Sequence, residues 1–230
     1  MSFLRDFIEL FFPRVCCICG NPLVGTEKQI CTHCLLNLPE SLSAKGDSNI
    51  VEKRLMGRIP IVASTALLVF SENSMAQKIL HQIKYYGNTE LAVSMGRQLG
   101  MRLAESDRFD SVDIIVPVPL HRKKLRKRGY NQSFLICQGI AQTFPRPINR
   151  DNLIRTKHTE TQTRKNREER IENMHNVFHL LDESVFENKH VLLVDDVITT
   201  GSTTEACWNA MKETKGIKIS VISLAITGEY

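Results

Sequence analysis

The amino-acid sequence predicts an α/β fold, with a parallel sheet flanked by helices and a small metal-binding segment in front of it. Short apolar runs alternate with amphipathic helical patterns over most of the chain, which is typical of βαβ units and a parallel sheet. Two Cys-x-x-Cys pairs near the N-terminus indicate the metal-binding segment. With 230 residues, 42% hydrophobic and 24% charged, the chain can form one domain of this class and a small appendage.

Each element of the predicted sheet and its helices follows from a local pattern. Apolar runs bounded by polar residues predict strands, at residues 63–70, 114–116, 191–194 and 218–225. Apolar side chains three and four positions apart predict helices, at residues 74–84, 91–99 and 133–143. A further helix is expected to begin near Ser202, because Glu205 three positions later completes a capping signature.

Four cysteines have the spacing of a closed structural zinc site, namely Cys16, Cys19, Cys31 and Cys34. Four thiolates can surround one Zn²⁺ tetrahedrally, and Gly20 allows the tight turn that such a knuckle requires. Because the segment is too short for a core of its own, metal binding should drive its folding. Cys17 makes a poorer knuckle and is left out of the set, although either Cys17 or His33 could replace one of the four ligands.

The domain organisation follows from these patterns. We expect a zinc-binding segment at residues 1–40, a polar linker rich in Ser, Gly and Asp at residues 41–54, and the α/β domain at residues 55–230. The apolar N-terminus is interrupted by Asp6 and Glu9, so neither a signal peptide nor membrane insertion is expected, and a cytoplasmic location is predicted. The remaining cysteines, Cys137 and Cys207, lie on apolar helical faces and are predicted to be core residues.

The segment from residue 190 to residue 205, HVLLVDDVITTGSTTE, carries the chemistry of a phosphosugar site. Asp195 and Asp196 end an apolar strand, where carboxylates can accept hydrogen bonds from sugar hydroxyls. An acidic pair alone would more often be a solvated strand end. Here it is followed by a hydroxyl-rich loop at a helix N-terminus, which favours a phosphate, formed by Thr199, Thr200, Gly201, Ser202 and Thr203. The segment resembles the phosphoribosyl pyrophosphate (PRPP) signature of type I phosphoribosyltransferases, and it lacks the Gly-Lys-Ser/Thr ending of a P-loop.

Two basic clusters interrupt the alternation of strands and helices. The first follows the strand at residues 114–116, and all but one of its residues from 122 to 128 are Lys or Arg. Prolines stiffen the preceding loop, so cations could meet a pyrophosphate at the same sheet edge as the acids. A solvated basic helix is the better interpretation of the lysines, whereas phosphate contact is favoured for Arg122, Arg126 and Arg128. The second cluster, residues 158–170, has no apolar stripe and is predicted to be a mobile loop.

Five motifs in order carry a closer resemblance. They are the double Cys-x-x-Cys segment, HQIKYYGNTELA at residues 81–92, DIIVPVPLHRKKLRKRGYNQS at 113–133, TQTRKNREERIENMHNVF at 161–178 and VLLVDDVITTGSTTEA at 191–206. In these motifs the chain resembles the ComF family, which is associated with DNA uptake in natural competence, and the likeness extends over nearly the whole chain.

The resemblance implies a zinc finger followed by a type I phosphoribosyltransferase domain that binds PRPP with Mg²⁺. It implies Asp195 and Asp196 as the catalytic pair, residues 117–120 as the pyrophosphate loop, and a mobile loop at residues 159–170 that closes over the site. The expected PRPP contacts, besides the arginines and loop residues named above, are Lys84, Tyr85, Pro117, Val118, Pro119, Leu120, Asn131, Gln132, Val197 and Ile198.

Three functions fit this set of residues. The first is displacement of pyrophosphate from C1 of PRPP by a nitrogen nucleophile, although no residue pattern marks a pocket for a particular acceptor. The second is a binding module for single-stranded DNA and competence proteins, with the basic clusters on phosphates and Tyr85, Tyr86 or Tyr130 stacking on bases. The third is a PRPP sensor acting on a partner. The net charge of +5 suits anionic ligands but does not separate these functions.

Overall fold

The computed structural model describes residues 13–41, 49–155 and 177–228, and its central feature is a parallel sheet. Within these residues four strands pair in the order β1-β6-β5-β2, all parallel. Their bounds are β1 Ile61–Phe70, β2 Ile114–Pro117, β5 His190–Ile198 and β6 Lys218–Thr227. The predicted parallel sheet is thereby confirmed, and each strand lies where its apolar run predicted it.

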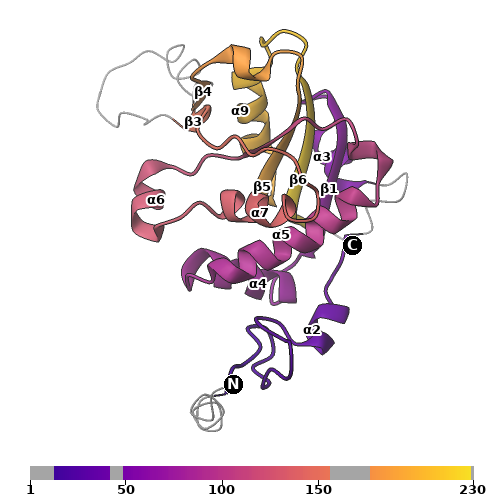
Figure 1. Ribbon diagram of the computed structural model, residues 1–230, viewed down its shortest axis with the longest axis vertical. Coiled ribbons are helices and arrows are strands. Elements are labelled where there is room, and N and C mark those ends of the chain that lie inside the picture. Colours follow the sequence, from indigo (N-terminus) through magenta and orange to yellow (C-terminus); the bar gives the residue numbers. More distant parts are fainter. Residues whose placement is uncertain (1–12, 42–48, 156–176, 229–230) are drawn as a thin grey trace.

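Helices cover both faces of the sheet and give three layers (Figure 1). The first face carries α4 Met75–Tyr85, α5 Thr89–Ala104 and α7 Gln132–Ile140, and the second carries α3 Ile50–Leu55, α9 Ser202–Met211 and a two-stranded antiparallel ribbon of β3 Leu153–Arg155 and β4 Phe178–Leu180. Strand β5 supplies both cores, because Leu192 and Val194 pack on the first face while Val191 and Leu193 pack on the second. All four side chains are fully buried, as expected for a strand in the middle of a parallel sheet.

Helices α5 and α7 approach each other closely enough that their backbones touch. A Cβ atom on Gly139 would lie 2.1 Å from the carbonyl oxygen of Val93, and one on Gly96 would lie 2.3 Å from the carbonyl oxygen of Ile136. Only glycine fits at these two positions. The contact fixes α7 on the first face of the sheet, with the start of the helix next to the carboxyl ends of β2 and β5.

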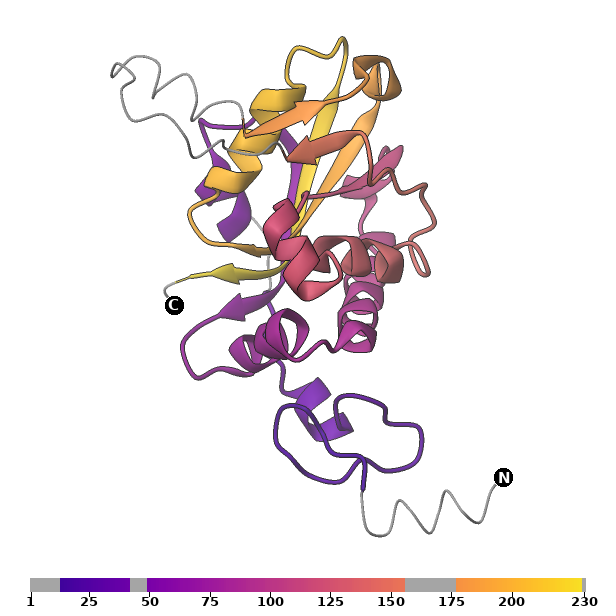
Figure 2. The same cartoon turned by 90° about the vertical axis from the view of Figure 1, so that its left-hand side faces the viewer.

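The cysteine-rich segment packs on α4 and α5, at the end of the molecule remote from α9 (Figure 2). It contains the short helix α2 Thr32–Leu36. The Lys78 ammonium donates to the Ile18 carbonyl at 3.0 Å, and the Asn88 amide donates to Gln29 Oε1 at 2.7 Å. Past α2, the Val69 N–H donates to the carbonyl of Pro39 at 2.8 Å, so this part of the chain runs along the edge of β1.

The structure differs from the sequence-based prediction in the segment expected to be a linker. Residues 42–48 lie outside the described residues, but α3 begins at Ile50, and its Val51 and Leu55 are fully buried against the sheet. A six-residue helix is too short for its spacing of apolar residues to stand out in the sequence. The position of the boundary between the segment and the domain stays a prediction.

Two other elements were absent from the predicted strands and long helices, although a solvated basic helix was one interpretation of the basic run. The basic run folds as the exposed helix α6 Arg122–Arg128, which ends at Gly129 with φ +83°, so the interpretation as a solvated basic helix describes its conformation correctly. The β3–β4 ribbon has only three residues in each strand. Two short 3₁₀ turns, Asp107–Phe109 and Glu183–Phe186, complete the described elements. The predicted mobile loop, residues 159–170, lies outside the described residues.

Candidate functional site

The two acids lie at the carboxyl end of β5, where parallel α/β sheets usually bind their ligands. Both residues are partly buried. Asp195 Oδ1 accepts a hydrogen bond from the backbone N–H of Asp196 at 2.8 Å and another from the Ser133 hydroxyl at 3.5 Å. The Lys84 ammonium, on the last turn of α4, lies 3.3 Å from Asp196 Oδ2. The acids are therefore held by named partners and are not a freely solvated strand end.

Burial raises the pKa of Asp195 to about 7, and the neighbouring charge of Asp196 acts in the same direction. The hydrogen bond from the Asp196 N–H, the charge of Lys84 and the hydrogen bond from Ser133 act in the opposite direction and are weaker together. The ionised form of Asp195 is thus destabilised in the free protein. Hydrogen-bond donors from a bound ligand would stabilise the ionised form.

The hydroxyl-rich loop connects β5 to α9 and forms the N-terminus of that helix. Gly201 is the N-cap residue, with φ +79°, and has no side chain to cap the helix, while the Ser202 N–H donates to the Thr200 hydroxyl at 3.4 Å. The expected capping role of Ser202 and Glu205 is therefore wrong, because the Glu205 carboxylate instead forms an ion pair with Arg58. The hydroxyl groups of Thr200 and Ser202 lie 2.9 Å apart, and both residues are exposed. The free helix end and these hydroxyls can bind a phosphate.

The predicted pyrophosphate loop starts directly beside the acids. Pro117 pairs with Val194, the residue before Asp195, and the Val118 N–H donates to the Val194 carbonyl at 2.9 Å. The Asn131 side-chain amide donates to the Val118 carbonyl at 3.0 Å and so fixes the turn. Pro119 and Leu120 follow and are partly accessible. The loop thus lies at the same sheet edge as the acids.

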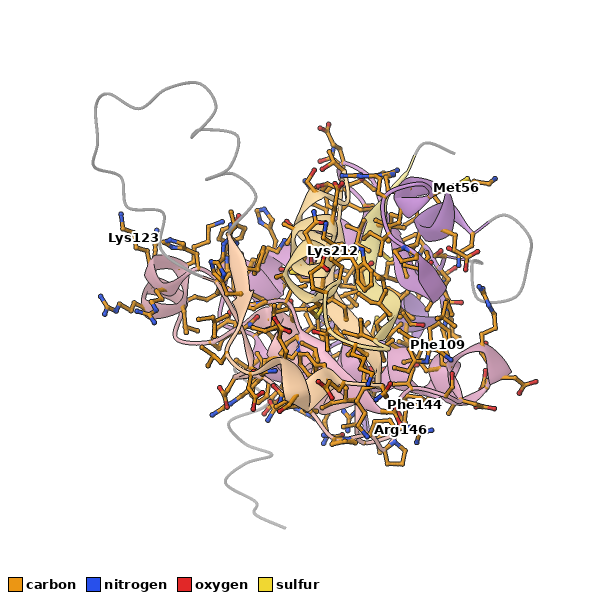
Figure 3. All side chains as sticks on the ribbon, turned by 90° about the horizontal axis from the view of Figure 1, so that it is seen from above. Met56, Phe109, Lys123, Phe144, Arg146 and Lys212 are labelled. Carbon is orange, nitrogen blue, oxygen red and sulfur yellow. The ribbon has the colours of Figure 1, made fainter. Side chains whose placement is uncertain are left out.

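Of the three predicted arginines, the structure brings Arg128 towards this edge. Its guanidinium carbon lies 5.9 Å from the centre of the Tyr85 ring, next in sequence to Lys84. Arg122 and Arg126 are exposed on α6 and make no ion pair within the described part of the chain. Figure 3 shows Lys123, from the same helix, at the periphery of the molecule. Phosphate contact by Arg122 and Arg126 stays a prediction.

Several predicted contact residues are buried beside the site and leave little or no side-chain surface for a ligand. They are Pro117, Val118, Gln132 and Ile198, together with Val197, which is partly buried against the core. Gln132 is only 1% exposed, and its Nε2 atom has no hydrogen-bond partner among the described residues. Ligand contact by these residues remains a prediction and would use mainly their backbone groups.

The four predicted zinc ligands form one cluster. The Sγ atoms of Cys16, Cys19, Cys31 and Cys34 lie within 4.8 Å of one another. Cys19 and Cys31 have their sulfurs 3.7 Å apart, close to the ~3.8 Å that follows from tetrahedral geometry with Zn–S bonds of about 2.3 Å. Neither Cys17 nor His33 belongs to the cluster. The sulfur geometry therefore fits a tetrahedral metal ion.

Backbone groups favour the thiolate form that a metal requires at Cys16, whereas burial raises the pKa of Cys34 and the pKa of Cys31 is also raised. The Cys31 N–H donates to Cys16 Sγ at 3.4 Å, and the Cys34 N–H donates to Cys31 Sγ at 3.5 Å. Burial opposes ionisation of Cys16, but the surrounding N–H donors outweigh it and lower the pKa of Cys16 to about 6. The cluster could therefore hold zinc, with no protein ligand position left open.

Two arginines on the α3 side of the sheet contact the loop of residues 199–203, which we call the phosphate-type loop. Neither arginine was predicted from the sequence. Arg54, in α3, donates to the carbonyl of Thr199, and Arg58 donates to the carbonyl of Thr200 and to Glu205. Both lie more than 140 positions away from the loop in sequence, and no local pattern marks them. Their proximity follows only from α3 packing on the second face of the sheet.

Comparison with known proteins matches this arrangement to one family. The family model described as "Phosphoribosyl transferase domain" matches residues 132–228. DNA utilization protein YhgH of Escherichia coli (strain K12) is 29% identical over 82% of this chain and 80% of its own length. Competence protein F of Haemophilus influenzae is 31% identical over 64% of this chain and 66% of its own. Competence protein ComFC of Bacillus subtilis is 25% identical over 93% of this chain and 83% of its own. The chain belongs to the ComF family.

The match of this ComF family member to ComFC includes most of the chain. Among solved structures, a hypoxanthine-guanine phosphoribosyltransferase from Bacillus anthracis aligns with 58% of this chain and 66% of its own, at 14% identity and a TM-score of 0.34. Within the described residues no helix is long and apolar enough to cross a membrane.

Proposed function

We propose that this protein binds PRPP with Mg²⁺ at the carboxyl edge of its sheet and acts in natural competence and DNA uptake. One observation carries the proposal: the acidic pair, the free N-terminus of α9 and the proline-stiffened loop after β2 converge on the same sheet edge. The names of the relatives, Competence protein F and Competence protein ComFC, support the biological role.

Each part of PRPP has a matching group on the protein. The 5-phosphate would bind at the loop of residues 199–203, where unpaired N–H groups and hydroxyls gather. The ribose hydroxyls would donate to Asp195 and Asp196. The pyrophosphate would lie between Lys84 and the loop of residues 117–120. Mg²⁺, bound together with PRPP, would neutralise part of the pyrophosphate charge, and carboxylates at this edge suit a hard cation.

The reaction that fits this arrangement is transfer of the phosphoribosyl group. The bond between C1 and the pyrophosphate oxygen breaks, the electron pair leaves with pyrophosphate, and a nitrogen nucleophile forms the new bond to C1. The protein contributes orientation of the ribose and positive charge near the leaving group. The acceptor stays open, because no residue pattern marks a pocket for a particular base.

Calorimetric titration of the zinc-loaded protein with PRPP, with and without Mg²⁺, tests the proposal. We expect binding on the order of micromolar with Mg²⁺, and we expect Asp195→Asn combined with Asp196→Asn to abolish it while the circular dichroism spectrum stays unchanged. Binding of equal affinity by the folded double variant would show that the acids are only a strand end.

Single-stranded DNA binding is a second candidate function, and helix α6 is the observation that favours it. The helix buries none of its residues, and nearby Tyr85 and Tyr86 are 68% and 72% exposed, so cations and stacking surfaces lie together. Tyr130 is less suited to stacking, because its hydroxyl donates to the Ile83 carbonyl. DNA affinity should fall steeply with salt and lose part of that slope in Arg122→Ala with Arg126→Ala. An affinity that is independent of salt would exclude this function.

A further inference from the structure

The two arginines of the α3 region hold the backbone of the phosphate-type loop from the second face of the sheet. Arg54 Nη1 donates to the Thr199 carbonyl, and Arg58 Nη1 donates to the Thr200 carbonyl. Arg54 also donates to the Thr227 carbonyl at 2.6 Å, at the carboxyl end of β6. Arg54 is thus tied to β6 as well as to the loop, and two successive carbonyl groups of the loop point towards α3.

Peptide geometry converts the direction of these carbonyls into the direction of the next N–H groups. In a trans peptide the C=O of one residue and the N–H of the following residue lie in one plane and point in opposite directions. The N–H groups of Thr200 and Gly201 must therefore point away from α3. Neither donates to a protein acceptor among the described residues, so both are available on the ligand side of the loop.

Packing prevents the loop from turning over. Gly201 is buried with φ +79°, and a Cβ atom there would lie 2.7 Å from Leu55 Cδ2 and 3.2 Å from Arg58 Nη1. The loop therefore rests directly on α3, with no space between them. A glycine is needed both for the positive φ and for this close approach.

The charge of Arg58 is already balanced within the protein. Its Nε donates to Glu205 Oε2 at 3.0 Å, and its second terminal nitrogen forms an ion pair with the same carboxylate. Glu205 lies in the first turn of α9 and so anchors the guanidinium between the helix and the loop. An arginine paired in this way is arranged to fix the backbone and not to act as the counterion of a ligand phosphate.

We propose that Arg54 and Arg58 are positioning residues that aim the N–H groups of Thr200 and Gly201 at the ligand phosphate. The proposal rests on the proposed function, because the phosphate belongs to PRPP. It adds that binding of the phosphate depends on two side chains outside the PRPP motif. These side chains set the orientation of two peptide planes and do not touch the ligand.

The test compares Arg58→Ala and Arg58→Lys with Arg108→Ala. Arg108 is the matched control, because it also forms an ion pair with a glutamate, Glu52 of α3, at similar exposure but away from the loop. Arg58 holds the Thr200 carbonyl and therefore aims the Gly201 N–H. Loss of this one aligned N–H contact to a charged group should weaken PRPP binding on the order of 10- to 100-fold. Lysine should not restore binding, since it lacks the planar fork that reaches a carbonyl and a carboxylate together. Arg108→Ala should bind as the wild type does.

Two further readouts separate positioning from direct contact or general loss of stability. The ¹H–¹⁵N signals of Thr200 and Gly201 in the ligand-free protein should shift in Arg58→Ala and stay in place in Arg108→Ala. The salt dependence of PRPP affinity should keep its slope in Arg58→Ala, because no ligand counterion is removed. In addition, Glu205→Ala should weaken binding in the wild type but have little further effect in Arg58→Ala, as coupled residues do.

The possible outcomes decide between the two proposals. Weaker binding with unmoved amide signals and a reduced salt slope would overturn positioning in favour of direct phosphate contact. Shifted amides with unchanged affinity would also overturn it, by showing that loop orientation does not matter. A wild-type protein that binds no PRPP would refute the proposed function, whereas the amide signals of the ligand-free variants would still show whether Arg58 orients the loop.

Discussion

Replacement of Asp195 by Asn is expected to stabilise the folded protein while it removes the ligand site. Asp195 is partly buried beside a second carboxylate, and its hydrogen bonds come from the Ser133 hydroxyl and the Asp196 N–H. An asparagine oxygen can accept both hydrogen bonds without a charge. The substitution therefore removes the cost of the charge and keeps the geometry.

The magnitude follows from the pKa of Asp195, which burial raises from 3.8 to about 7. One pKa unit corresponds to about 1.4 kcal/mol, so the ionised side chain lowers the free energy of unfolding by about 4 kcal/mol above pH 7. The sign follows from linkage. Between pH 4 and pH 7 the unfolded chain has lost this proton and the folded protein still holds it, so the cost grows as the pH rises and is constant above pH 7.

Denaturant unfolding at several pH values measures this difference. The advantage of Asp195→Asn over the wild type should be about 4 kcal/mol at pH 8.5 and about 2 kcal/mol at pH 5.5, and the melting temperature at pH 8.5 should rise on the order of 10 °C. Asp113→Asn is the control, because the Asp113 carboxylate accepts the His190 N–H at 2.7 Å at the opposite end of β5. That variant should give no gain in stability.

The reasoning is refuted by an Asp195→Asn protein that is less stable than the wild type at pH 8.5, or whose advantage does not change with pH. The first result would mean that the carboxylate is stabilised by its partners more than it is destabilised by burial. The second would mean that the gain comes from packing and not from the charge. Loss of Mg-PRPP binding should accompany the gain, so stability and function change in opposite directions.

Two further predictions concern the metal cluster and the helix contact beneath the sheet. Cys16→Ser should lose bound zinc, as measured by elemental analysis, and unfold its own segment while the α/β domain still melts cooperatively; Cys17→Ser should keep its zinc, and equal metal content in the two variants would show that Cys17 or His33 completes the site. Gly139→Ala should cost about 1–3 kcal/mol of unfolding free energy, because its Cβ would lie 2.1 Å from the Val93 carbonyl oxygen. Gln138→Ala, exposed on the same helix, should be nearly neutral.

The central strands and the long helices could be predicted from the sequence because their patterns are local and strong. Strand β5 is buried on both faces, so its apolar run is continuous. Helix α4 begins where the Ser74 hydroxyl accepts the Gln77 N–H, at the start of the predicted apolar spacing. Helix α3 and the β3–β4 ribbon could not be predicted, because six residues and three residues carry too little of either period.

The candidate site could be predicted in part, for a related reason. The acids and the loop that follows them are consecutive in sequence, so one motif contains both their chemistry and their spacing. Lys84 could be assigned to the site only through a resemblance, since its contact with Asp196 joins α4 to β5 across the fold. Arg54 and Arg58 had no such support, and only the packing of α3 reveals them.

The residues of the motif provide donors and acceptors, but they do not by themselves fix the directions in which these groups point. A Thr-Thr-Gly-Ser loop can adopt several backbone conformations, and glycine widens the choice. In this protein the Arg54 and Arg58 hydrogen bonds select one conformation, and the ion pair with Glu205 fixes Arg58 against the helix that the loop begins. The burial that raises the pKa of Asp195 also depends on packing away from the motif. The glycine contact with α5 holds α7 against the strand that carries Asp195. The Thr200 and Gly201 N–H groups thus keep one direction, and the acids keep their partly buried position, because residues on both faces of the sheet hold them in place, as is common for locally unfavourable sites in folded proteins.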